Sequence, residues 1–261
     1  MKALVKLGGS LLETEESRRR LVRDLAEAAR QRVRLVVVHG GGKQLTRYLA
    51  ERGVESRFIG GLRVTTPETL DAVLKVVAGS VNHELVAAFV QAGARAVGLT
   101  GVDACLVEAE PLAPELGAVG RPARTNPELL ELLVSRGYLP VVACVAGDRE
   151  GRVYNVNADQ MAAACAAGFA ADRLLFLTDV AGLLDAQKRV LELVTAAECQ
   201  ALIAAGVASG GMQAKLNAAL EALRLGVPEV DIAPGAQPGI IGRWLAGERV
   251  GTRLVREAPD A

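Results

Sequence analysis

Short runs of apolar residues recur along the chain and alternate with longer stretches in which apolar positions follow a helical spacing. Six runs have strand length, at residues 3–7, 34–38, 95–99, 139–145, 173–177 and 229–233. Their apolar residues are consecutive instead of alternating with polar ones, which is typical of strands covered on both faces. The sequence therefore predicts a mainly parallel sheet between helical layers.

The stretches between these runs predict helices. They cover residues 14–31, 42–52, 67–92 (with an interruption near Gly79 and Ser80), 126–136, 158–169, 195–205 and 211–225. Strands alternating with helices predict an α/β fold, a three-layer αβα sandwich with a mainly parallel central sheet. Prolines and glycines in 106–125 predict short antiparallel strands or a hairpin, and 239–256 predicts a short turn and strand.

A modest boundary near Ala170 divides the chain into two expected lobes, residues 1–172 and 173–261. No internal repeat, low-complexity stretch or long linker separates them. We therefore expect two closely packed lobes instead of two independent domains.

The charge balance narrows the function classes. Thirty Lys and Arg residues offset thirty Asp and Glu residues, which argues against broad capture of nucleic acid or of an anionic membrane.

No apolar run approaches the roughly 20 residues needed to span a bilayer, and the first glycines come too early for a signal peptide. Cys105, Cys144, Cys165 and Cys199 have no paired spacing, so we expect free thiols and a cytoplasmic protein, without a zinc site or disulfides.

Two predicted strands end in glycine-rich loops that carry a lysine, KLGGS at 6–10 and HGGGK at 39–43. The carboxyl ends of parallel strands face the ligand crevice, where glycines let backbone N–H groups approach phosphate or carboxylate oxygens. Neither loop has the spacing of a Walker A loop or of a dinucleotide fingerprint. The alternative is that these glycines only form tight turns.

A third lysine follows the sequence SGGMQA at 209–214. Lys215 falls at the edge of the apolar stripe in the first turns of a predicted helix, where the helix dipole disfavours a cation. A nearby anion would offset both costs. The alternative is a lysine whose head reaches solvent.

Polar side chains also cluster before another predicted helix, in the sequence NVNADQ at 155–160. Either Asn157 or Asp159 can cap that helix, whereas Asn155 and Asn157 share one face of an extended segment that could address a ligand. Arg63, in GLRVT at 61–65, suits a bidentate contact with a carboxylate, although a lone arginine is usually a surface residue.

Taken in order, these segments resemble the amino acid kinase family, and within it the acetylglutamate branch. The similar segments are VKLGGSLL at 5–12, VVVHGGGKQ at 36–44, GLRVT at 61–65, GYLPVV at 137–142, NVNADQ at 155–160, LTDVAGLL at 177–184, GGMQAKLNAAL at 210–220 and GTRLV at 251–255. The KLGGS segment is shared across the family, whereas GLRVT, NVNADQ and GGMQAK together are specific to the branch. One departure from the family pattern is Lys43, which follows the glycines at 40–42 and would add a positive charge near the site.

The resemblance implies transfer of the ATP γ-phosphoryl group to the side-chain carboxylate of N-acetyl-L-glutamate, in arginine biosynthesis. It implies catalytic roles for Lys6, Lys215 and Asp159, with the aspartate orienting the lysines. The substrate-binding residues implied are Gly41, Gly42, Arg63 and Asn155. The phosphate- and ATP-binding residues implied are Gly8, Gly9, Asp179, Val180, Gly182, Leu183, Leu184, Gly210, Gly211 and Met212. Mg²⁺ is expected to be held mainly by phosphates, without a metal site made by the protein.

Two other functions fit the same resemblance. One is a kinase for aminoadipate or glutamate attached to an acidic carrier protein, and the other is a non-catalytic sensor on the same fold. The sensor is disfavoured because Lys6, Lys215 and Asp159 are all present.

The resemblance also bears on assembly. The first predicted strand begins at about Ala3, which leaves no segment for the N-terminal helix that joins arginine-inhibited relatives into hexamers. We therefore expect a homodimer that arginine does not inhibit. We expect the two copies to meet through the helix at 67–92 and its neighbours, with Val73, Val76, Val77 and Val81 offering apolar surface.

Overall fold

The computed structural model describes residues 1–12, 14–31, 33–185, 187–208 and 210–257. Its centre is an eight-stranded sheet with the strand order β12-β14-β13-β11-β1-β2-β8-β5. The strands are β1 (Lys2–Leu7), β2 (Arg34–His39), β5 (Ala96–Thr100), β8 (Leu139–Ala143), β11 (Arg173–Thr178), β12 (Leu193–Thr195), β13 (Glu229–Pro234) and β14 (Thr252–Val255). All neighbouring pairs are parallel except β13 with β14. The predicted mainly parallel α/β sheet is confirmed.

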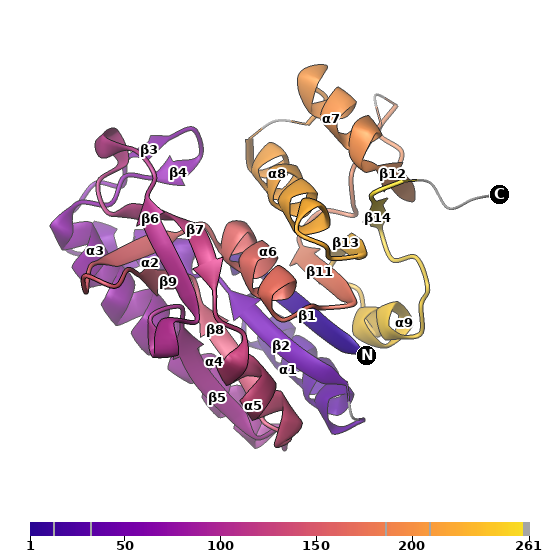
Figure 1. The fold of residues 1–261 in the computed structure, drawn as a ribbon, viewed down its shortest axis with the longest axis horizontal. Helices are drawn as coiled ribbons and strands as arrows, with labels where there is room; N and C mark the ends of the chain where they lie inside the picture. Colours follow the sequence, from indigo (N-terminus) through magenta and orange to yellow (C-terminus); the bar gives the residue numbers. More distant parts are fainter. Residues whose placement is uncertain (13, 32, 186, 209, 258–261) are drawn as a thin grey trace.

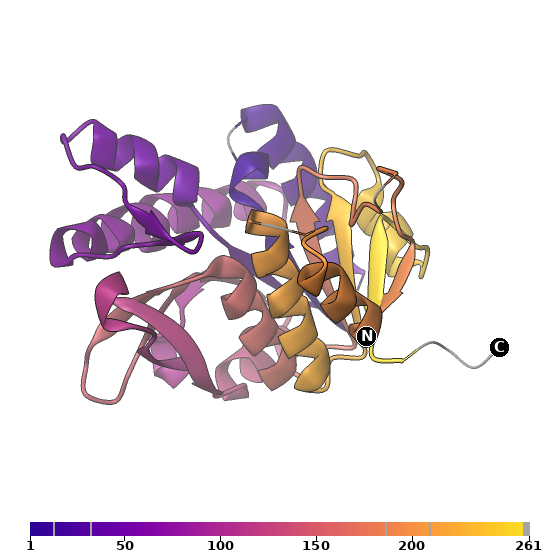
Figure 2. The same cartoon turned by 90° about the horizontal axis from the view of Figure 1, so that it is seen from above.

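Helices cover both faces of the sheet. They are α1 (Glu15–Arg30), α2 (Gly42–Ala50), α3 (Pro67–Val73), α4 (Asn82–Gln91), α5 (Glu128–Ser135), α6 (Ala158–Gly168), α7 (Ala196–Ala204), α8 (Gly210–Arg224) and α9 (Ile240–Leu245). Figure 1 shows α6 and α8 side by side in front of the sheet with α1 and α4 behind it, and Figure 2 shows the same layers from above. The expected turn and strand at 239–256 is partly wrong, because Ile240, Ile241 and Trp244 bury one side of a short helix before β14.

The helix expected at 67–92 is continuous, since α3 passes through the π-helix η2 (Leu74–Val81) into α4. Gly79 therefore lies in a widened turn, where we expected an interruption. By length and composition this helix could also cross a membrane, with a mean hydropathy of 1.4 in its most apolar window, 39% of which is buried in the molecule. The expectation that no apolar run reaches this length is thus wrong. A single such helix is weak support for a membrane span, because core helices have the same composition.

The valines of this helix point inward. Val73, Val76, Val77 and Val81 are at most 5% exposed and belong to the hydrophobic core. The expectation that they offer surface for a dimer contact is wrong, because they pack within their own chain. The large apolar residues that this helix does expose are Leu74 and Val90.

Shorter strands build a second unit beside the sheet. Strands β6 (Val107–Pro111), β7 (Val119–Thr125), β9 (Val145–Gly147) and β10 (Val153–Val156) form a small closed barrel. The antiparallel β6–β7 pair confirms the hairpin predicted in 106–125. Strand β10 leads directly into α6, and β3 (Phe58–Ile59) pairs with β4 (Leu62–Arg63) in a separate hairpin. The barrel and this hairpin position Asn155 and Arg63.

The predicted lobe boundary falls where β11 begins. Strand β11 pairs with β1 in parallel, with Lys6 opposite Phe176. The two expected lobes therefore share one continuous sheet, and their division at 172/173 stays a prediction.

Candidate active site

Three charged side chains from distant parts of the chain meet above the carboxyl end of β1. Lys6 lies near the end of β1, Asp159 in the first turn of α6 and Lys215 in the second turn of α8. The Lys6 Nζ lies 2.8 Å from Asp159 Oδ1, and the Lys215 Nζ lies 3.1 Å from Asp159 Oδ2. Each residue is only 7% exposed. Two buried cations thus share one buried carboxylate, which leaves the cluster with an excess of positive charge.

The pKa values reflect this arrangement. Burial by itself would raise the pKa of Asp159, but the charges of Lys6 and Lys215 outweigh it and lower that pKa. Burial and then the charge of Lys6 lower the pKa of Lys215. Asp159 is therefore ionised, and the excess positive charge favours an anion beside the two lysines.

The structure resolves two alternatives that the sequence leaves open. Asn157 caps α6, since its Oδ1 accepts from the backbone N–H groups of Asp159 and Gln160 at 2.9 and 3.2 Å. Asp159 is thereby free to bind the lysines. The head of Lys215 does not reach solvent, because it lies over the ring of Phe176, 5.4 Å from the centroid, and binds Asp159.

The two glycine-rich loops lie next to each other. A methyl group on Gly9 would lie 3.9 Å from the amide nitrogen of Gly42, so the loops approach at backbone distance. The expected contact between the Gly8 amide and phosphate is corrected, because that N–H already donates to the Leu177 carbonyl at 3.0 Å. Gly8 is instead the point where β1 approaches β11, and a Cβ there would lie 2.9 Å from the same carbonyl.

Arg63 is held against the 40–42 loop and the start of α2. Its Nη2 donates to the Gly42 carbonyl at 3.2 Å and to Thr46 Oγ1 at 2.8 Å, its Nη1 donates to Ser56, and its guanidinium lies 4.7 Å from the centroid of Phe58. Burial lowers the pKa of Arg63. Arg63 is thus a buried, oriented guanidinium, and the alternative of a surface arginine is excluded.

Asn155 is linked to the same segment. Its Nδ2 donates to Thr65 Oγ1 at 3.0 Å, and the Thr65 hydroxyl donates to the Arg63 carbonyl at 3.0 Å. Two neighbouring cavities of about 170 and 420 Å³ connect these residues. Asn155 lines the smaller cavity and Lys6 the larger, while the 40–42 loop, Phe58 and Arg63 line both.

The residues expected to bind the nucleotide are less closely grouped. Asp179 follows β11 and lines the 420 Å³ cavity with Lys6 and Gly9. Val180 and Leu184 are each 39% exposed, whereas Leu183 is buried and its N–H donates to Thr252 Oγ1 at 2.8 Å.

Two further parts of the expected nucleotide site differ in their surroundings. Gly182 is buried against Thr252, where a Cβ would lie 2.7 Å from the hydroxyl oxygen. Gly210 and Gly211 at the start of α8 are exposed, and Met212 is half-buried. Ser209, the first residue of the segment SGGMQA at 209–214, lies outside the described residues. The roles of these residues in binding ATP stay predictions.

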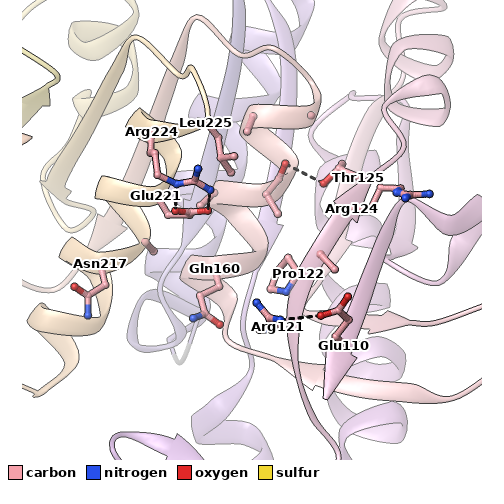
Figure 3. Close-up of a pocket in the computed structure, with 16 residues that line it drawn as sticks. Glu110, Arg121, Pro122, Arg124, Thr125, Gln160, Asn217, Glu221, Arg224 and Leu225 are labelled. Carbon is pink, nitrogen blue, oxygen red and sulfur yellow. Dashed lines mark hydrogen bonds and ion pairs between the residues drawn. The ribbon is translucent and has the colours of Figure 1, made fainter. Parts of the chain in front are cut away.

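A larger cavity, of about 800 Å³, lies away from these residues, between the β6–β7 hairpin, α6 and α8 (Figure 3). Its charged side chains come largely as exposed ion pairs, Arg121 with Glu110 and Arg224 with Glu221. None of the residues implied by the resemblance lines it. Converging buried charge, and not cavity size, therefore identifies the candidate site.

Residues that the sequence analysis did not single out also line the 420 Å³ cavity. They include Ser10, Thr46 and Phe58. Ser10 follows Gly9 directly and could have been found from that position. Thr46 and Phe58 lie in a helix and a two-residue strand without any local signal, and only the fold brings them to Arg63.

The described residues do not form a metal centre of their own, since they contain no group of three or more His, Cys, Asp or Glu side chains close enough to hold an ion. Both oxygens of Asp159 are engaged by lysines, which leaves Asp179 as the available carboxylate in the 420 Å³ cavity. This donor set fits Mg²⁺ that arrives with a nucleotide and keeps phosphate and water ligands.

The fold and the site define an α/β protein with an excess of buried positive charge at the carboxyl ends of parallel strands, an arrangement suited to anionic ligands such as phosphates. Residues 1–234 match the model of the amino acid kinase family. The chain belongs to the amino acid kinase family. Over 255 residues it is 64% identical to the acetylglutamate kinase of Solibacter usitatus (strain Ellin6076). The alignment covers 98% of this chain and 99% of that protein.

Solved structures agree with this assignment. The N-acetylglutamate synthase from Neisseria gonorrhoeae, complexed with coenzyme A and N-acetyl-glutamate, has a TM-score of 0.87 and 26% identity, covering 99% of this chain and 60% of that one. The carbamate kinase from Giardia lamblia bound to AMP-PNP has a TM-score of 0.73 and covers 98% of both chains. Its identity of 18% supports the fold alone.

Proposed function

We propose that this chain transfers the γ-phosphoryl group of ATP to the side-chain carboxylate of N-acetyl-L-glutamate, giving N-acetyl-L-glutamyl 5-phosphate in arginine biosynthesis. The proposal rests mainly on one observation: Lys6 and Lys215 both form ion pairs with the carboxylate of Asp159, beside a small cavity that Arg63 lines. The name of the 64% identical relative, acetylglutamate kinase, supports the same substrate.

The chemistry needs little beyond positioning and charge. A carboxylate oxygen of the substrate attacks the γ-phosphorus, the bond from that phosphorus to the bridging oxygen breaks, and ADP keeps the electron pair. A carboxylic acid with a pKa near 4 is already ionised at neutral pH, so no general base is required. This fits a site whose buried carboxylate, Asp159, is engaged by two lysines and is not available as a base.

We assign each charged residue and loop amide of the site a separate role in this reaction. Lys6 and Lys215 stabilise charge on the transferring phosphoryl group, and Asp159 holds their ammonium groups in place. Amides of Gly9, Gly41 and Gly42 approach the reacting oxygens.

The acid pocket orients the substrate. Arg63 binds the α-carboxylate of the substrate through its oriented guanidinium. Asn155, in the same cavity, contacts the acetamido group or the nearby carboxylate.

The nucleotide occupies the surface formed by the segments 179–184 and 207–215, with Mg²⁺ held mainly by its phosphates. The position of Asp179 in the same cavity as Lys6 supports this placement. We place the acid in residues 1–172 and the nucleotide in 173–261, and expect the two lobes to close on them to exclude water. Small-angle scattering of the free protein and of the protein with both ligands should then show compaction, and identical profiles would contradict closure.

A coupled assay for ADP release tests the function directly. Free N-acetyl-L-glutamate should support turnover with MgATP, whereas L-glutamate and a carrier-linked glutamate or aminoadipate should support far less, because the acid cavity of about 170 Å³ suits a small free acid. Turnover with only the carrier-linked substrate would favour the carrier pathway. Binding of both ligands without ADP release would favour a sensor.

We further propose that the protein is a cytoplasmic homodimer. Strand β5 is an edge of the sheet, its residues Ala96–Thr100 are mostly half-buried, and α4 beside it exposes Val90 (55%). A partly exposed edge strand can pair with the same strand of a second copy around a two-fold axis. The four cysteines are unpaired and three are buried, which fits a reducing compartment. Mass measurement in solution tests the dimer, and Val90→Glu should weaken it.

A further inference from the structure

A buried histidine lies directly before the 40–42 loop and has no role in the proposed reaction. His39 is the last residue of β2, is fully buried, and precedes Gly40 directly. A polar ring in an apolar core needs hydrogen-bond partners. The Nδ1 of His39 lies 2.7 Å from the Gly40 carbonyl oxygen, and the Nε2 lies 3.0 Å from Nδ2 of Asn82.

These partners fix the tautomer of the ring. The Nδ2 of Asn82 also lies 2.9 Å from the Val141 carbonyl oxygen, and a carbonyl can only accept, so this atom is the amide nitrogen and a donor. Nε2 of His39 must then accept, which places the proton on Nδ1, where it is donated to the Gly40 carbonyl. Burial lowers the pKa of His39 to about 4, which keeps the ring neutral in this tautomer.

Holding the Gly40 carbonyl also orients the next amide. The carbonyl of Gly40 and the N–H of Gly41 belong to one planar trans peptide unit and point in opposite directions. With the carbonyl drawn toward His39 in the core, the Gly41 N–H is directed away from the core, on the side where the 40–42 loop lines both cavities.

The partner of His39 comes from an unusual piece of helix. Asn82 is 2% exposed and follows the π-helical segment Leu74–Val81 directly. π-Helical turns are rare and frequent at functional sites. The same segment also supports the loop through Val77, whose Cγ2 would lie 3.1 Å from a Cβ on Gly41.

Strand β5 leaves room for the side chain of Asn82, because it has a glycine where the two meet. A Cβ on Gly98 would lie 2.1 Å from Asn82 Oδ1. A glycine is therefore required at position 98 for the amide of Asn82 to reach His39.

We propose that His39 and Asn82 are positioning residues, which hold the Gly40–Gly41 peptide so that the Gly41 amide faces the reacting oxygens. This inference rests on the proposed function for its kinetic readout, but not for its structural one. The π-helical segment is then part of the site, because it leads directly into Asn82 and lines the cavity of about 170 Å³ through Val77.

The kinetic experiment compares two substitutions of the same histidine. His39→Asn places an amide donor at the former Nδ1 position, whereas His39→Gln places it near the former Nε2 position and leaves the Gly40 carbonyl without a donor. We expect His39→Gln and Asn82→Leu to lower kcat/KM for the acid about 10–100-fold with the KM for ATP within about 2-fold, since small misplacements of a reacting group cost this much. His39→Asn should recover most of the loss.

Phe89→Leu is the matched control, because Phe89 is fully buried in α4 but is not among the residues that line the two cavities of the site. It should lower the melting temperature without changing the kinetics by more than about 2-fold. Equal kinetic losses in Phe89→Leu and His39→Gln at matched melting temperatures would overturn the proposal, as would a folded His39→Asn protein without rescue.

Nitrogen chemical shifts of the imidazole give a readout that does not depend on activity. We expect a protonated Nδ1 and an unprotonated Nε2 in the wild-type protein, and the opposite tautomer would overturn the proposal. If the wild-type protein does not phosphorylate N-acetyl-L-glutamate, the proposed function fails. The tautomer, together with the orientation of the Gly40–Gly41 peptide in a crystal structure of His39→Gln, still decides the positioning role.

Discussion

Lys6 and Lys215 lie on the same carboxylate, although one is in the first strand and the other in the last long helix of the chain. The Nζ of Lys6 is 2.8 Å from Oδ1 of Asp159, and the Nζ of Lys215 is 3.1 Å from Oδ2. Two buried cations facing one buried anion leave an uncompensated positive charge, which is favourable only when a further anion is bound. The cluster is therefore arranged for a negatively charged group that arrives with the substrates.

Removing either lysine should act mainly on the chemical step. We expect Lys6→Ala and Lys215→Ala to lower kcat about 10²–10³-fold with smaller changes in KM, because each charge is aimed at the transferring phosphoryl group. Steady-state kinetics of ADP release measures both constants. Lys75→Ala is the control, since its side chain is 58% exposed and pairs with the exposed Asp71. An unchanged kcat in either variant would remove that lysine from the mechanism.

Removing the arginine should act on substrate binding instead. We expect Arg63→Ala to raise the KM for N-acetyl-L-glutamate at least 10-fold and to leave the KM for ATP nearly constant, because a charge-assisted contact contributes about 1.5–3 kcal/mol. Arg52→Ala is a suitable control, since Arg52 is exposed and stacks on Tyr48. An equal rise in both KM values would show that Arg63 does not belong to the acid pocket alone.

Stability should fall as the pH falls from about 6.5 to 4. The pKa of His39 is lowered from 6.5 to about 4 by burial, so in this range the unfolded chain binds a proton that the folded chain does not. Acidification therefore favours unfolding, by roughly 3 kcal/mol in total. Urea unfolding at a series of pH values measures the slope.

The chain offers a control for this titration, because its other histidine, His83, is exposed. The slope between pH 6.5 and 4 should decrease in His39→Gln and remain in His83→Gln. If both variants keep the wild-type slope, His39 is not the titrating group.

A buried ion cluster in the second expected lobe should dominate the stability of that part of the sheet. Asp231 is fully buried and accepts hydrogen bonds from Arg173 and Arg253, each at 3.0 Å, and from the indole of Trp244 at 2.7 Å. Asp231→Asn removes the negative charge between two guanidinium groups, and we expect a loss of about 3–5 kcal/mol.

An exposed pair provides the comparison. Asp71→Asn breaks the contact with Lys75, in which both side chains are well exposed, and should cost less than about 1 kcal/mol. Chemical unfolding of the two variants measures both losses. Similar losses in the free energy of unfolding would show that the buried Asp231 cluster stabilises the protein no more than an exposed ion pair does.

Parts of the site with a local signal could be read from the sequence. Glycine-rich loops after strands predict an anion site because backbone freedom and strand ends are local properties. Lys215 was noticeable because a cation in the first turns of a helix is locally unfavourable. The order of the motifs extended these signals to a family, and the family match and the mainly parallel sheet are confirmed.

Other parts had no local signal. Val73, Val76, Val77 and Val81 have the same composition whether they face a partner or the core, so their burial could not be read from helical spacing. The occupied amide of Gly8 depends on its distance to Leu177, on a strand from the far half of the chain. The π-helical segment before Asn82 likewise packs against α2 and β9, which adjoin it only in the folded chain.

The sequence by itself determined most of the strands and helices, where the two glycine-rich loops lie, and the family to which the chain belongs. These properties depend on residue type and on spacing over a few positions. Only the tertiary structure decided that Asn157 caps α6 while Asp159 binds the two lysines, and that Asn82 reaches His39. Such contacts join residues far apart in the chain, and their distances are set by the order of strands in the sheet and by the packing of helices on it.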